Sequence, residues 1–392
     1  MKLFSTEQVS KYHPDKYADQ ISDAVLAACL AQDPYSRVAC ECMVKDGYIV
    51  LGGEIRTNAK VNYEQVAKSV ARKLKYKVNK VINLIGQQSN EIYNGTTKAG
   101  GLTGAGDQGI MFGYATNETE SYLPYAFDLA NKIIKTIEYD VEHNPNTILR
   151  GDAKTQVTTD LDQKQDISAI YKILVSVCHN KRVSIVKVRD YITNLLQPLL
   201  QGFNGKLIIN PAGLWTIGGP TADCGLTGRK IVCDQYGGFC AVGGGAFSGK
   251  DPSKVDRSAA YMARHIAVDV VKKFTTVKTC EVQLAYAIGQ ADPMSVRVIV
   301  DGLDAPDYIY KHVTSHFKLT PSCIIDELGL LCWNYEKVAE GCHFRENINW
   351  NFLSTLIEVE VFEWQFAYLC RHDICILLAE RSDLDRYFNI FL

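Results

Sequence analysis

Apolar and polar positions alternate along the first part of the chain in a pattern that predicts a helix. Residues 17–32 place Ile21, Val25 and Cys29 on one helical face, and Pro34 follows just beyond the end of this segment. The spacing of three to four residues is that of a helix with one buried face.

The next pattern predicts two strands and a second helix. The apolar runs 37–44 and 48–55 flank Asp46 and Gly47, and an Asp-Gly pair between two such runs is a strong signal for a tight hairpin turn. Residues 61–76 then return to helical spacing. A block of helix, hairpin and helix is typical of an α+β architecture.

The rest of the chain continues this mixture but interrupts it twice. Residues 86–109 are rich in Gly, Thr and Asn and have no period, and a turn-rich stretch reaches residue 249. A long irregular segment inside a compact protein is usually functional, although a flexible domain linker is the simpler alternative for 86–109. Further helices are expected at 122–140, 186–200 and 251–274, and strands within 154–175 and at 206–210, 281–289 and 295–302.

Composition bounds the class of protein. The chain has 392 residues, which is enough for two or three domains. The formal net charge is -2, so no overall basic field indicates nucleic acid as a partner. Any anionic ligand must therefore be held by local clusters of cations.

The sequence also gives expectations about location. The first 16 residues lack the apolar stretch of a signal peptide, and no run reaches the ~18 apolar residues that cross a bilayer. The 13 cysteines are scattered, without a CxxC pair or zinc-ligand spacing. We expect a cytoplasmic protein with no membrane contact and with free, mostly buried thiols, the alternative being a disulfide or metal framework.

The strongest local motif is a glycine-rich loop at 242–250 that precedes a helix. Asp251 is a good N-cap and Pro252 a good first helical residue, so we expect the helix to begin there. Free N–H groups at such a helix start bind anions. The motif therefore predicts a polyphosphate cradle, the alternative being a turn with solvated lysines. Its candidate cations are Lys250, Lys254, Arg257 and Arg264.

Two look-alike motifs fail on inspection. Gly244, Gly249 and Lys250 match a Walker A loop, but Asp251 stands where a Ser or Thr must bind magnesium. Residues 104–109 match GxGxxG, but no strand precedes them and the following residues look extended, so the Rossmann context is absent. What remains of the second motif is a loop that presents Asp107.

A third element is the tetrapeptide His13-Pro14-Asp15-Lys16, followed by Asp19 and Asp23 on the first helix. His and Lys can contact phosphate oxygens, and an aspartate can hold Mg²⁺. A capped helix start is the simpler reading of this tetrapeptide alone. Two further elements are the glycine-rich segment 218–238, with Asp223, Arg229 and Lys230, and the Asp152-Ala153-Lys154 tripeptide. Several glycine-rich turns that each carry Lys, Arg or Asp favour phosphate and metal chemistry at one site.

Taken together, these motifs resemble the S-adenosylmethionine synthases, also called methionine adenosyltransferases. The segments HPDK with ADQISDAVL, GAGDQGIMFGYATNET, GGPTADCGLTGRKI and GGGAFSGKDPSKVDRSAAY follow in the family's order and spacing, over about residues 4–350. The resemblance implies an α+β fold of three similar α/β-sandwich domains about a pseudo-threefold axis. We accordingly expect domains at 1–101, 102–219 and 220–352, followed by a divergent tail at 353–392 of unknown role.

The resemblance also implies roles for individual residues. Catalysis would rest on His13, Lys154, Arg229, Lys230 and Lys250. ATP would contact the same five residues together with Asp152, Trp215, Asp223 and Ala246. Methionine would contact Glu54, Gln88, Asp107, Asp223 and Lys254. Two Mg²⁺ ions per site would be held by Asp15 and Asp256, and K⁺ would lie at Glu41.

The implied reaction explains why cations gather at such a site. The sulfur of L-methionine attacks the 5′ carbon of ATP, and the triphosphate leaves and is then hydrolysed to pyrophosphate and phosphate. The sulfur needs no base, so the obstacle is the negative charge that grows on the leaving group. In this family the active sites lie between two subunits, so a homodimer or a dimer of dimers is implied, and residues 86–107 match the mobile loop that covers the site.

Some positions depart from the usual family pattern. Tyr12 stands where glycine is usual, and Gly151 replaces the proline of a typical RPDAK segment. Residues 340–350 match the family's ending only loosely, and 353–392 match nothing familiar. A catalytically silent regulatory member of the family is one alternative. A kinase-like phosphotransferase is another, but Asp251 and the missing Walker B strand count against it.

Overall fold

The first block of the computed structural model has the predicted order of elements. The structure describes residues 1–87, 97–98, 101–102 and 104–345. Strand β1 (Leu3–Val9) leads into helix α1 (Pro14–Leu30), and β2 (Arg37–Lys45) and β3 (Tyr48–Arg56) form the expected hairpin. Asp46 and Gly47 have φ angles of 46° and 83°, as a two-residue hairpin turn with positive φ requires.

The later helices and strands also lie close to their predicted positions. Helices at 61–76, 122–140 and 186–200 and the strands of the second half are all present, with ends shifted by a few residues. The elements are α2 (Tyr63–Lys73), β4 (Lys80–Asn83), β5 (Thr97–Lys98), β6 (Gly101–Leu102), β7 (Gly109–Thr116), α4 (Tyr125–His143), β8 (Leu149–Asp160), β9 (Ile170–His179), α5 (Ile185–Leu196), β10 (Lys206–Ile209), β11 (Gly225–Leu226), α6 (Ile231–Asp234), α7 (Val255–Lys273), β12 (Thr279–Tyr286), β13 (Ser295–Val300), β14 (Leu303–Asp304), α8 (Asp307–His316), α9 (Pro321–Glu327) and α10 (Tyr335–Val338).

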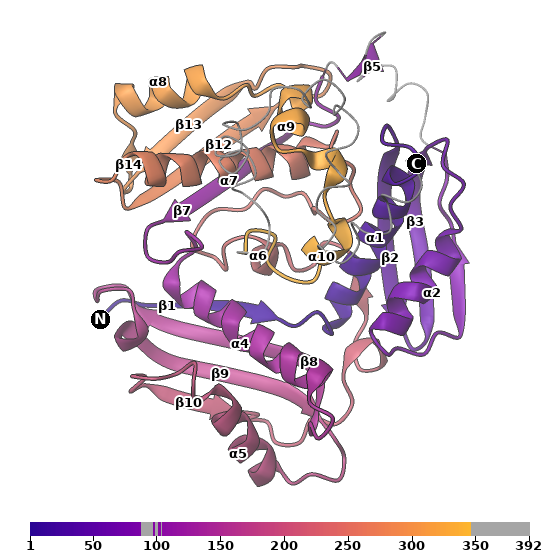
Figure 1. The fold of residues 1–392 in the computed structure, drawn as a ribbon, viewed down its shortest axis with the longest axis vertical. Coiled ribbons are helices and arrows are strands. Elements are labelled where there is room, and N and C mark those ends of the chain that lie inside the picture. The colour runs from indigo at the N-terminus through magenta and orange to yellow at the C-terminus, as the bar shows by residue number, and fades with distance from the viewer. Residues whose placement is uncertain (88–96, 99–100, 103, 346–392) are drawn as a thin grey trace, which may run out of the picture. The chain divides into compact units, whose positions relative to one another are not determined.

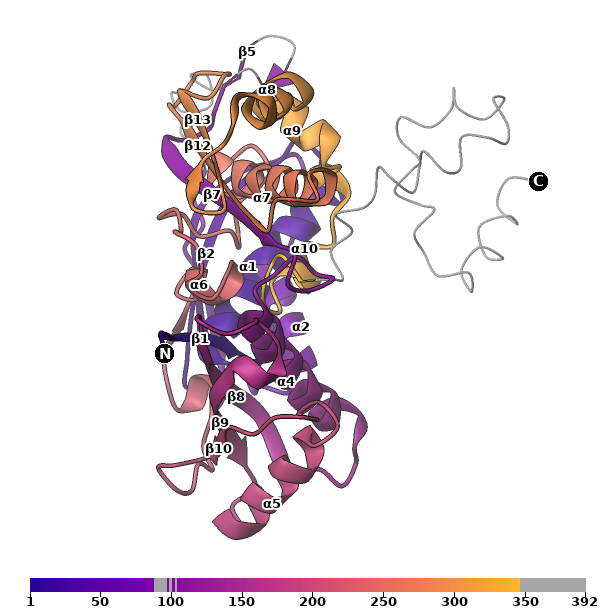
Figure 2. The same cartoon turned by 90° about the vertical axis from the view of Figure 1, so that its left-hand side faces the viewer.

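Three four-stranded sheets, each covered by helices on one face, make up residues 1–345 (Figure 1). The strand orders are β11-β2-β3-β4, β1-β8-β9-β10 and β14-β13-β12-β7. Helix α1 packs on β2, α4 on β8, and α7 on β7 and β12. In Figure 2 the large helices lie on one side of the sheets. This confirms the predicted α+β fold of three similar α/β-sandwich domains.

The three sheets exchange strands in a cycle. Strand β1 pairs with β8, β7 with β12, and β11 with β2, so each sheet receives one strand from a different segment of the chain. The exchange repeats three times, as a pseudo-threefold relation requires. Each sheet contains strands from both sides of an expected domain boundary, at 101 or at 219. The domain ranges therefore stay a prediction, and they do not correspond one to one with the sheets.

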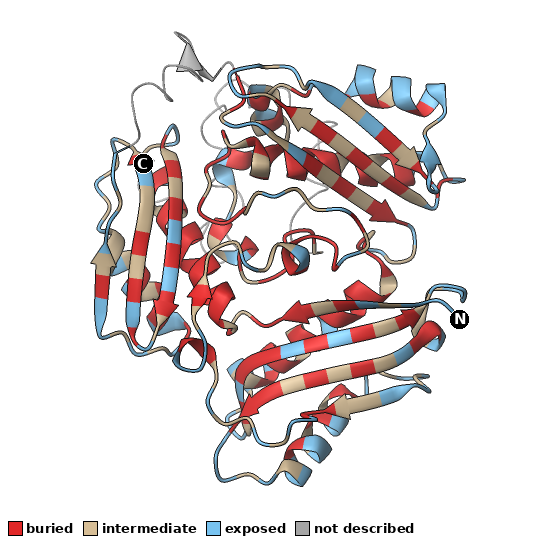
Figure 3. Ribbon diagram, turned by 180° about the vertical axis from the view of Figure 1, so that it is seen from behind, coloured by how far each residue is buried: buried red, intermediate tan, exposed pale blue. Residues whose placement is uncertain are grey.

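Burial follows the strand period and places the hydrophobic cores between sheets and helices. Strand β12 alternates strictly between half-buried and buried residues, which is the pattern of a sheet with one covered face (Figure 3). One core lies under α4 and α5 and includes Ile133, Val157 and Val175. Another lies under α1 and α2. The uncovered sheet faces remain open to a ligand or a partner.

The described residues agree in part with the expectations about cysteines and membranes. Ten cysteines are free, and eight of them are buried. Cys332 differs, because it is disulfide-bonded. Within the described ranges, no helix combines the length and the apolar character that a membrane span needs.

Candidate functional site

One face of α1 carries a row of buried carboxylates. Three aspartates spaced four residues apart share this face, and each accepts a backbone N–H from a glycine-rich loop. The row therefore fixes both candidate phosphate loops on a single helix. Asp15 Oδ1 accepts from the Leu226 N–H at 3.0 Å, Asp19 Oδ1 from the Gly228 N–H at 2.9 Å, and Asp23 Oδ1 from the Gly249 N–H at 2.8 Å.

His13 caps this helix and is neutral. Its Nδ1 accepts the Asp15 N–H at 3.2 Å, which leaves Nε2 as the protonated nitrogen. Burial, assisted by the positive charges of Lys230 and Lys154, lowers the pKa of His13 to about 4. At neutral pH the ring can therefore donate one hydrogen bond to an anionic oxygen.

Asp15 is ion-paired with Lys230. The Lys230 Nζ lies 2.6 Å from Asp15 Oδ2. Burial alone would raise the pKa of Asp15, but the hydrogen bonds from Lys230 and from the Leu226 N–H lower it overall. A charged carboxylate and an ammonium group therefore lie beside His13.

A second lysine–aspartate pair joins Lys250 to Asp256. Lys250 forms a bridge with Ala39 of β2, which ties its loop to the first sheet. A Cβ on Gly245 would lie 2.3 Å from Asp256 Cγ, so only glycine lets this loop approach the carboxylate. The loop that contains Ala246 therefore closes over the first turn of α7.

The two lysine–aspartate pairs lie on loops that touch. A Cβ on Gly228 would lie 2.4 Å from the Ala246 Cβ, and Gly228 is adjacent to Arg229. The GLTGRK and GGGAFSGK segments, at 225–230 and 243–250 with the short helix α6 between them, thus meet over α1. The structure brings these two predicted phosphate loops together.

Strand β8 adds Asp152 and Lys154 from the second sheet. Lys154 Nζ lies 2.9 Å from Glu7 Oε2 on β1. Asp152 Oδ2 accepts the Gly219 N–H at 2.6 Å, while its buried Oδ1 has no hydrogen-bond partner within the described part of the chain. Burial raises the pKa of Asp152 to about 6 although the Gly219 bond opposes this shift. An unpaired buried acceptor is suited to a ligand hydroxyl or amino group.

The other candidate residues lie on more open surface. Trp215 Nε1 donates to the Ile217 carbonyl at 2.7 Å. Asp107 is exposed and accepts the N–H of its neighbour Gln108 at 2.8 Å. Asp223 is exposed, and its charge offsets a small part of the lowering of the His13 pKa. Glu41, Glu54 and Arg229 are exposed, and Gln88 lies outside the described residues.

Family models match almost the whole described chain. They are the S-adenosylmethionine synthetase N-terminal domain over residues 1–94, the central domain over 102–215 and the C-terminal domain over 217–352. The chain belongs to the S-adenosylmethionine synthetase family. The enzyme is therefore a transferase of the methionine adenosyltransferase class.

Individual relatives agree with this family. The S-adenosylmethionine synthase of Sulfurovum sp. (strain NBC37-1) is 40% identical over 380 residues, which cover 92% of this chain and 98% of the relative. The solved structure of an unusual S-adenosylmethionine synthetase from Campylobacter jejuni superposes with a TM-score of 0.82 at 34% identity, covering 91% of this chain and 98% of that one.

Two expectations about the glycine-rich motif of this S-adenosylmethionine synthetase family member are wrong. Helix α7 begins at Val255, after the N-cap Lys254, and does not begin at residue 251. The Asp251 carboxylate is buried, accepts the Val38 N–H at 2.7 Å and ion-pairs with Lys254. Asp251 ties the loop to β2, so a turn separates it from the helix. Lys254, a predicted methionine ligand, is held by this aspartate.

The expectation that Arg257 and Arg264 belong to the polyphosphate cradle is also wrong. The Arg257 guanidinium bonds both oxygens of Asp23 at 2.7 Å, and both side chains are buried. Arg264 donates to the carbonyls of Tyr114, Ser121 and Tyr122. Both arginines therefore hold structural elements together and do not face a phosphate site.

Sequence reasoning missed the structural role of Lys16. This lysine is fully buried, with its Nζ 2.6 Å from Asp234 Oδ1 and 3.0 Å from Asp19 Oδ2. Its bond to Asp234 joins α1 to α6. The four-residue spacing of the aspartates on α1 was the available signal, since it places three charges on one face.

Proposed function

We propose that this enzyme makes S-adenosyl-L-methionine from ATP and L-methionine and hydrolyses the released triphosphate to pyrophosphate and phosphate. The observation that carries the proposal is the meeting of two loops that each hold a lysine on an aspartate, beside a neutral histidine. These pairs are Lys230 with Asp15 and Lys250 with Asp256.

The electrostatics suit departure of a triphosphate. In the first step the methionine sulfur forms a bond to the ribose 5′ carbon, and the bond from that carbon to the triphosphate oxygen breaks. Lys230 and Lys250 can turn from their carboxylates to the leaving oxygens, because a lysine ammonium rotates on a flexible stem. The neutral His13 donates its Nε2 hydrogen to the same group. Removing one such donor typically costs ~2.7–4 kcal/mol of transition-state stabilisation.

The proposal assigns the remaining groups to the two substrates. Asp152 offers its unpaired Oδ1 to the nucleoside, and Trp215 offers an aromatic face to adenine. Lys154 and Arg229 add positive charge for the phosphates. On the methionine side we assign Glu54, Asp107, Asp223 and Lys254, with Asp107 accepting the amino group, and Gln88 from the segment outside the described residues.

The donor set is compatible with two Mg²⁺ ions. No group of three or more His, Cys, Asp or Glu side chains in the described ranges is placed to hold a metal alone. Mg²⁺ at a nucleotide site commonly takes one or two carboxylates together with substrate phosphates. Asp15 and Asp256 each supply one such carboxylate, and bound Mg²⁺ would neutralise phosphate charge. We assign K⁺ to Glu41 on the open face of β2.

We further propose that two copies of the chain share the active site. The proposed methionine ligand Glu54 and the apolar Met43 are exposed on the uncovered face of the β2–β3 pair, and Asp107 is exposed in the loop before β7. A second copy placed on this face would exclude water from the reacting groups. A homodimer, alone or as a dimer of dimers, supplies this cover. We also keep the cytoplasmic location as a prediction.

The decisive test is a product analysis. The purified protein is incubated with ATP, L-methionine, Mg²⁺ and K⁺, and S-adenosylmethionine, pyrophosphate and phosphate are quantified. Equal yields of the three products are expected. Binding of ATP without S-adenosylmethionine would contradict the proposal and indicate a silent regulatory member, and release of ADP would indicate a phosphotransferase.

A further inference from the structure

The two residues that depart from the family pattern touch one another. A Cβ on Gly151 would lie 2.6 Å from Tyr12 Cδ2 and 2.7 Å from Tyr12 Cγ, so the tyrosine ring fills the space of a residue-151 side chain. Gly151 has a φ of 92°, which side chains other than glycine rarely adopt. Each member of this pair directly precedes a candidate site residue: Tyr12 precedes His13, and Gly151 precedes Asp152.

Backbone hydrogen bonds hold the two segments against each other. The Ser10 Oγ donates to the Gly151 carbonyl at 2.7 Å and accepts the Ala153 N–H at 3.1 Å. The Ser10 N–H donates to the Ala153 carbonyl at 2.9 Å. The pairing of β8 with β9 shifts register between Leu149 and Ala153, so Gly151 lies in an irregular stretch of the strand. Hydrogen bonds from Ser10 to Gly151 and Ala153 thus hold the turn before His13 against this irregular stretch, next to the contact between Tyr12 and Gly151.

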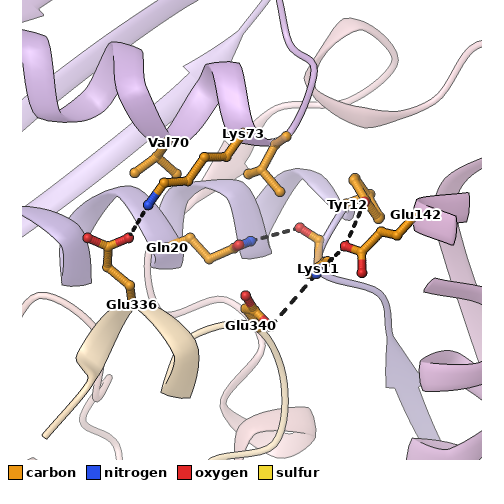
Figure 4. Close-up of a pocket in the computed structure, with 9 residues that line it drawn as sticks. Lys11, Tyr12, Gln20, Val70, Lys73, Glu142, Glu336 and Glu340 are labelled. Carbon is orange, nitrogen blue, oxygen red and sulfur yellow. Dashed lines mark hydrogen bonds and ion pairs between the residues drawn. The ribbon is translucent and has the colours of Figure 1, made fainter. Parts of the chain in front are cut away.

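The far end of the tyrosine is also fixed. The Tyr12 hydroxyl donates to Glu142 Oε1 at 3.1 Å, and the side chain is buried. Tyr12 and Glu142 line a polar cavity of about 160 Å³ with Lys11, whose Nζ also ion-pairs with Glu142 (Figure 4). Because the hydroxyl is anchored on α4, the ring cannot turn away from Gly151 without breaking this bond.

We propose that Tyr12 is a positioning residue, and that its ring against Gly151 sets the separation between His13 and Asp152. The inference rests on the proposed function, in which these two residues contact the polyphosphate and the nucleoside. Asp152 in turn accepts the Gly219 N–H at 2.6 Å, so the contact also determines where the GGP turn lies. A larger residue at 151 or a smaller one at 12 changes this separation.

A double-mutant cycle tests the pair. Tyr12→Ala and Gly151→Ala are each expected to lower kcat about tenfold, because small displacements of reacting groups reduce rate steeply. The double variant is expected to lose about 10- to 30-fold rather than the ~100-fold of independent sites, because removing the ring makes room for the new methyl group. The backbone strain of alanine at 151 occurs with and without Tyr12 and therefore cancels in the cycle.

Three controls separate positioning from general destabilisation. Tyr12→Phe keeps the ring and is expected to recover most of the kcat lost in Tyr12→Ala. The KM for methionine should stay within about twofold in all variants, because its proposed ligands Glu54 and Asp107 lie on other elements. Tyr171→Ala removes an exposed tyrosine from β9 and should leave kcat unchanged.

A second readout does not depend on synthesis. Affinity for inorganic tripolyphosphate is measured by calorimetry, and unfolding free energy by urea titration, across the same cycle. Coupling in tripolyphosphate affinity supports positioning even if the wild-type chain forms no S-adenosylmethionine, an outcome that would contradict only the proposed synthase activity. Losses that multiply in both kcat and tripolyphosphate affinity, or coupling in unfolding free energy alone, would overturn the pair as a positioning device.

Discussion

Two neighbouring residues in the first turn of α7, Asp256 and Arg257, each form an ion pair, and the two pairs differ in how far water reaches them. Asp23 and Arg257 join α1 to α7 through two bonds of 2.7 Å, and their side chains are 0% and 1% exposed. Lys250 and Asp256 are also bonded, but their side chains are 24% and 13% exposed. Both pairs combine one cation with one carboxylate, yet only the second is open to a substrate.

The choice of cation matches this difference. The planar guanidinium of Arg257 bonds both carboxylate oxygens and also lies over the Tyr335 ring, 4.3 Å from its centroid. This arrangement makes a permanent joint. The ammonium of Lys250 makes a single bond from a flexible stem, so it can exchange Asp256 for a phosphate oxygen. Buried Arg257 therefore holds α1 to α7, and the partly exposed Lys250 is the cation that we propose contacts the substrate.

The largest effect on stability is expected from breaking the buried pair. Asp23→Ala leaves the Arg257 charge buried without its partner and removes the acceptor of the Gly249 N–H. Removing one member of a buried pair costs about 3–5 kcal/mol of unfolding free energy. Urea denaturation followed by circular dichroism measures the loss. Asp162→Ala, at an exposed surface pair, is the matched control and should change it by less than about 0.5 kcal/mol. A loss below about 1 kcal/mol for Asp23→Ala would contradict the assignment of a structural joint.

The exposed pair should show the opposite behaviour. Lys250→Ala is expected to lower kcat for S-adenosylmethionine formation about 100- to 1,000-fold, because one donor to the leaving triphosphate is lost. The unfolding free energy should fall by less than it does for Asp23→Ala, since water reaches the Lys250–Asp256 pair and not the Asp23–Arg257 pair. Lys164→Ala, at a fully exposed lysine, serves as the control for charge alone. If the activity loss followed a comparable loss of stability, Lys250 would have to be classed with Arg257.

A third carboxylate sharpens the comparison because it is buried without an arginine fork. Glu138 accepts the Lys11 N–H at 2.6 Å, and burial raises its pKa to about 7 although this bond and Arg345 oppose the shift. Since the folded pKa lies above the unfolded value, the folded protein binds more protons, and its stability falls as pH rises from about 4.5 to 7.

Glu138→Gln removes this titration and keeps an acceptor for the Lys11 N–H. Relative to wild type, the variant should gain about 2–3 kcal/mol of unfolding free energy between pH 4.5 and pH 8. Urea titrations at the two pH values measure the difference. A gain that is equal at both pH values would show that the carboxyl group does not titrate in this range.

Local structure could be predicted from the sequence, but the partners of each element could not. The Asp46-Gly47 turn follows from residue chemistry at two positions, and the structure has it. The pairing of β1 with β8 joins residues 3–9 to residues 154–160, and nothing in a period of two specifies that partner. The alternation of apolar and polar residues therefore could not predict the strand exchange among the three sheets.

The same limit explains the errors at the candidate site. Lys230 and Asp15 were both recognised as polar residues in suggestive motifs, but their contact spans 215 positions of sequence. Arg257 and Arg264 were read as phosphate ligands because they follow a glycine-rich loop. They are seven residues apart and share a helical face with the buried Tyr261, and this spacing indicates an inward orientation.

The smallest effect is expected from Arg257→Lys, which separates charge from geometry in the buried pair. The positive charge remains, so Asp23 keeps a partner, but the second bond to Asp23, the Nε bond to the Tyr261 hydroxyl and the contact with the Tyr335 ring are lost. A loss of about 1–2 kcal/mol in unfolding free energy is expected, because hydrogen bonds of the guanidinium are removed without leaving an unpaired ion. Urea denaturation measures this loss beside that of Asp23→Ala. Equal losses would mean that the fork geometry of arginine, and not the compensation of its charge, dominates the joint between α1 and α7.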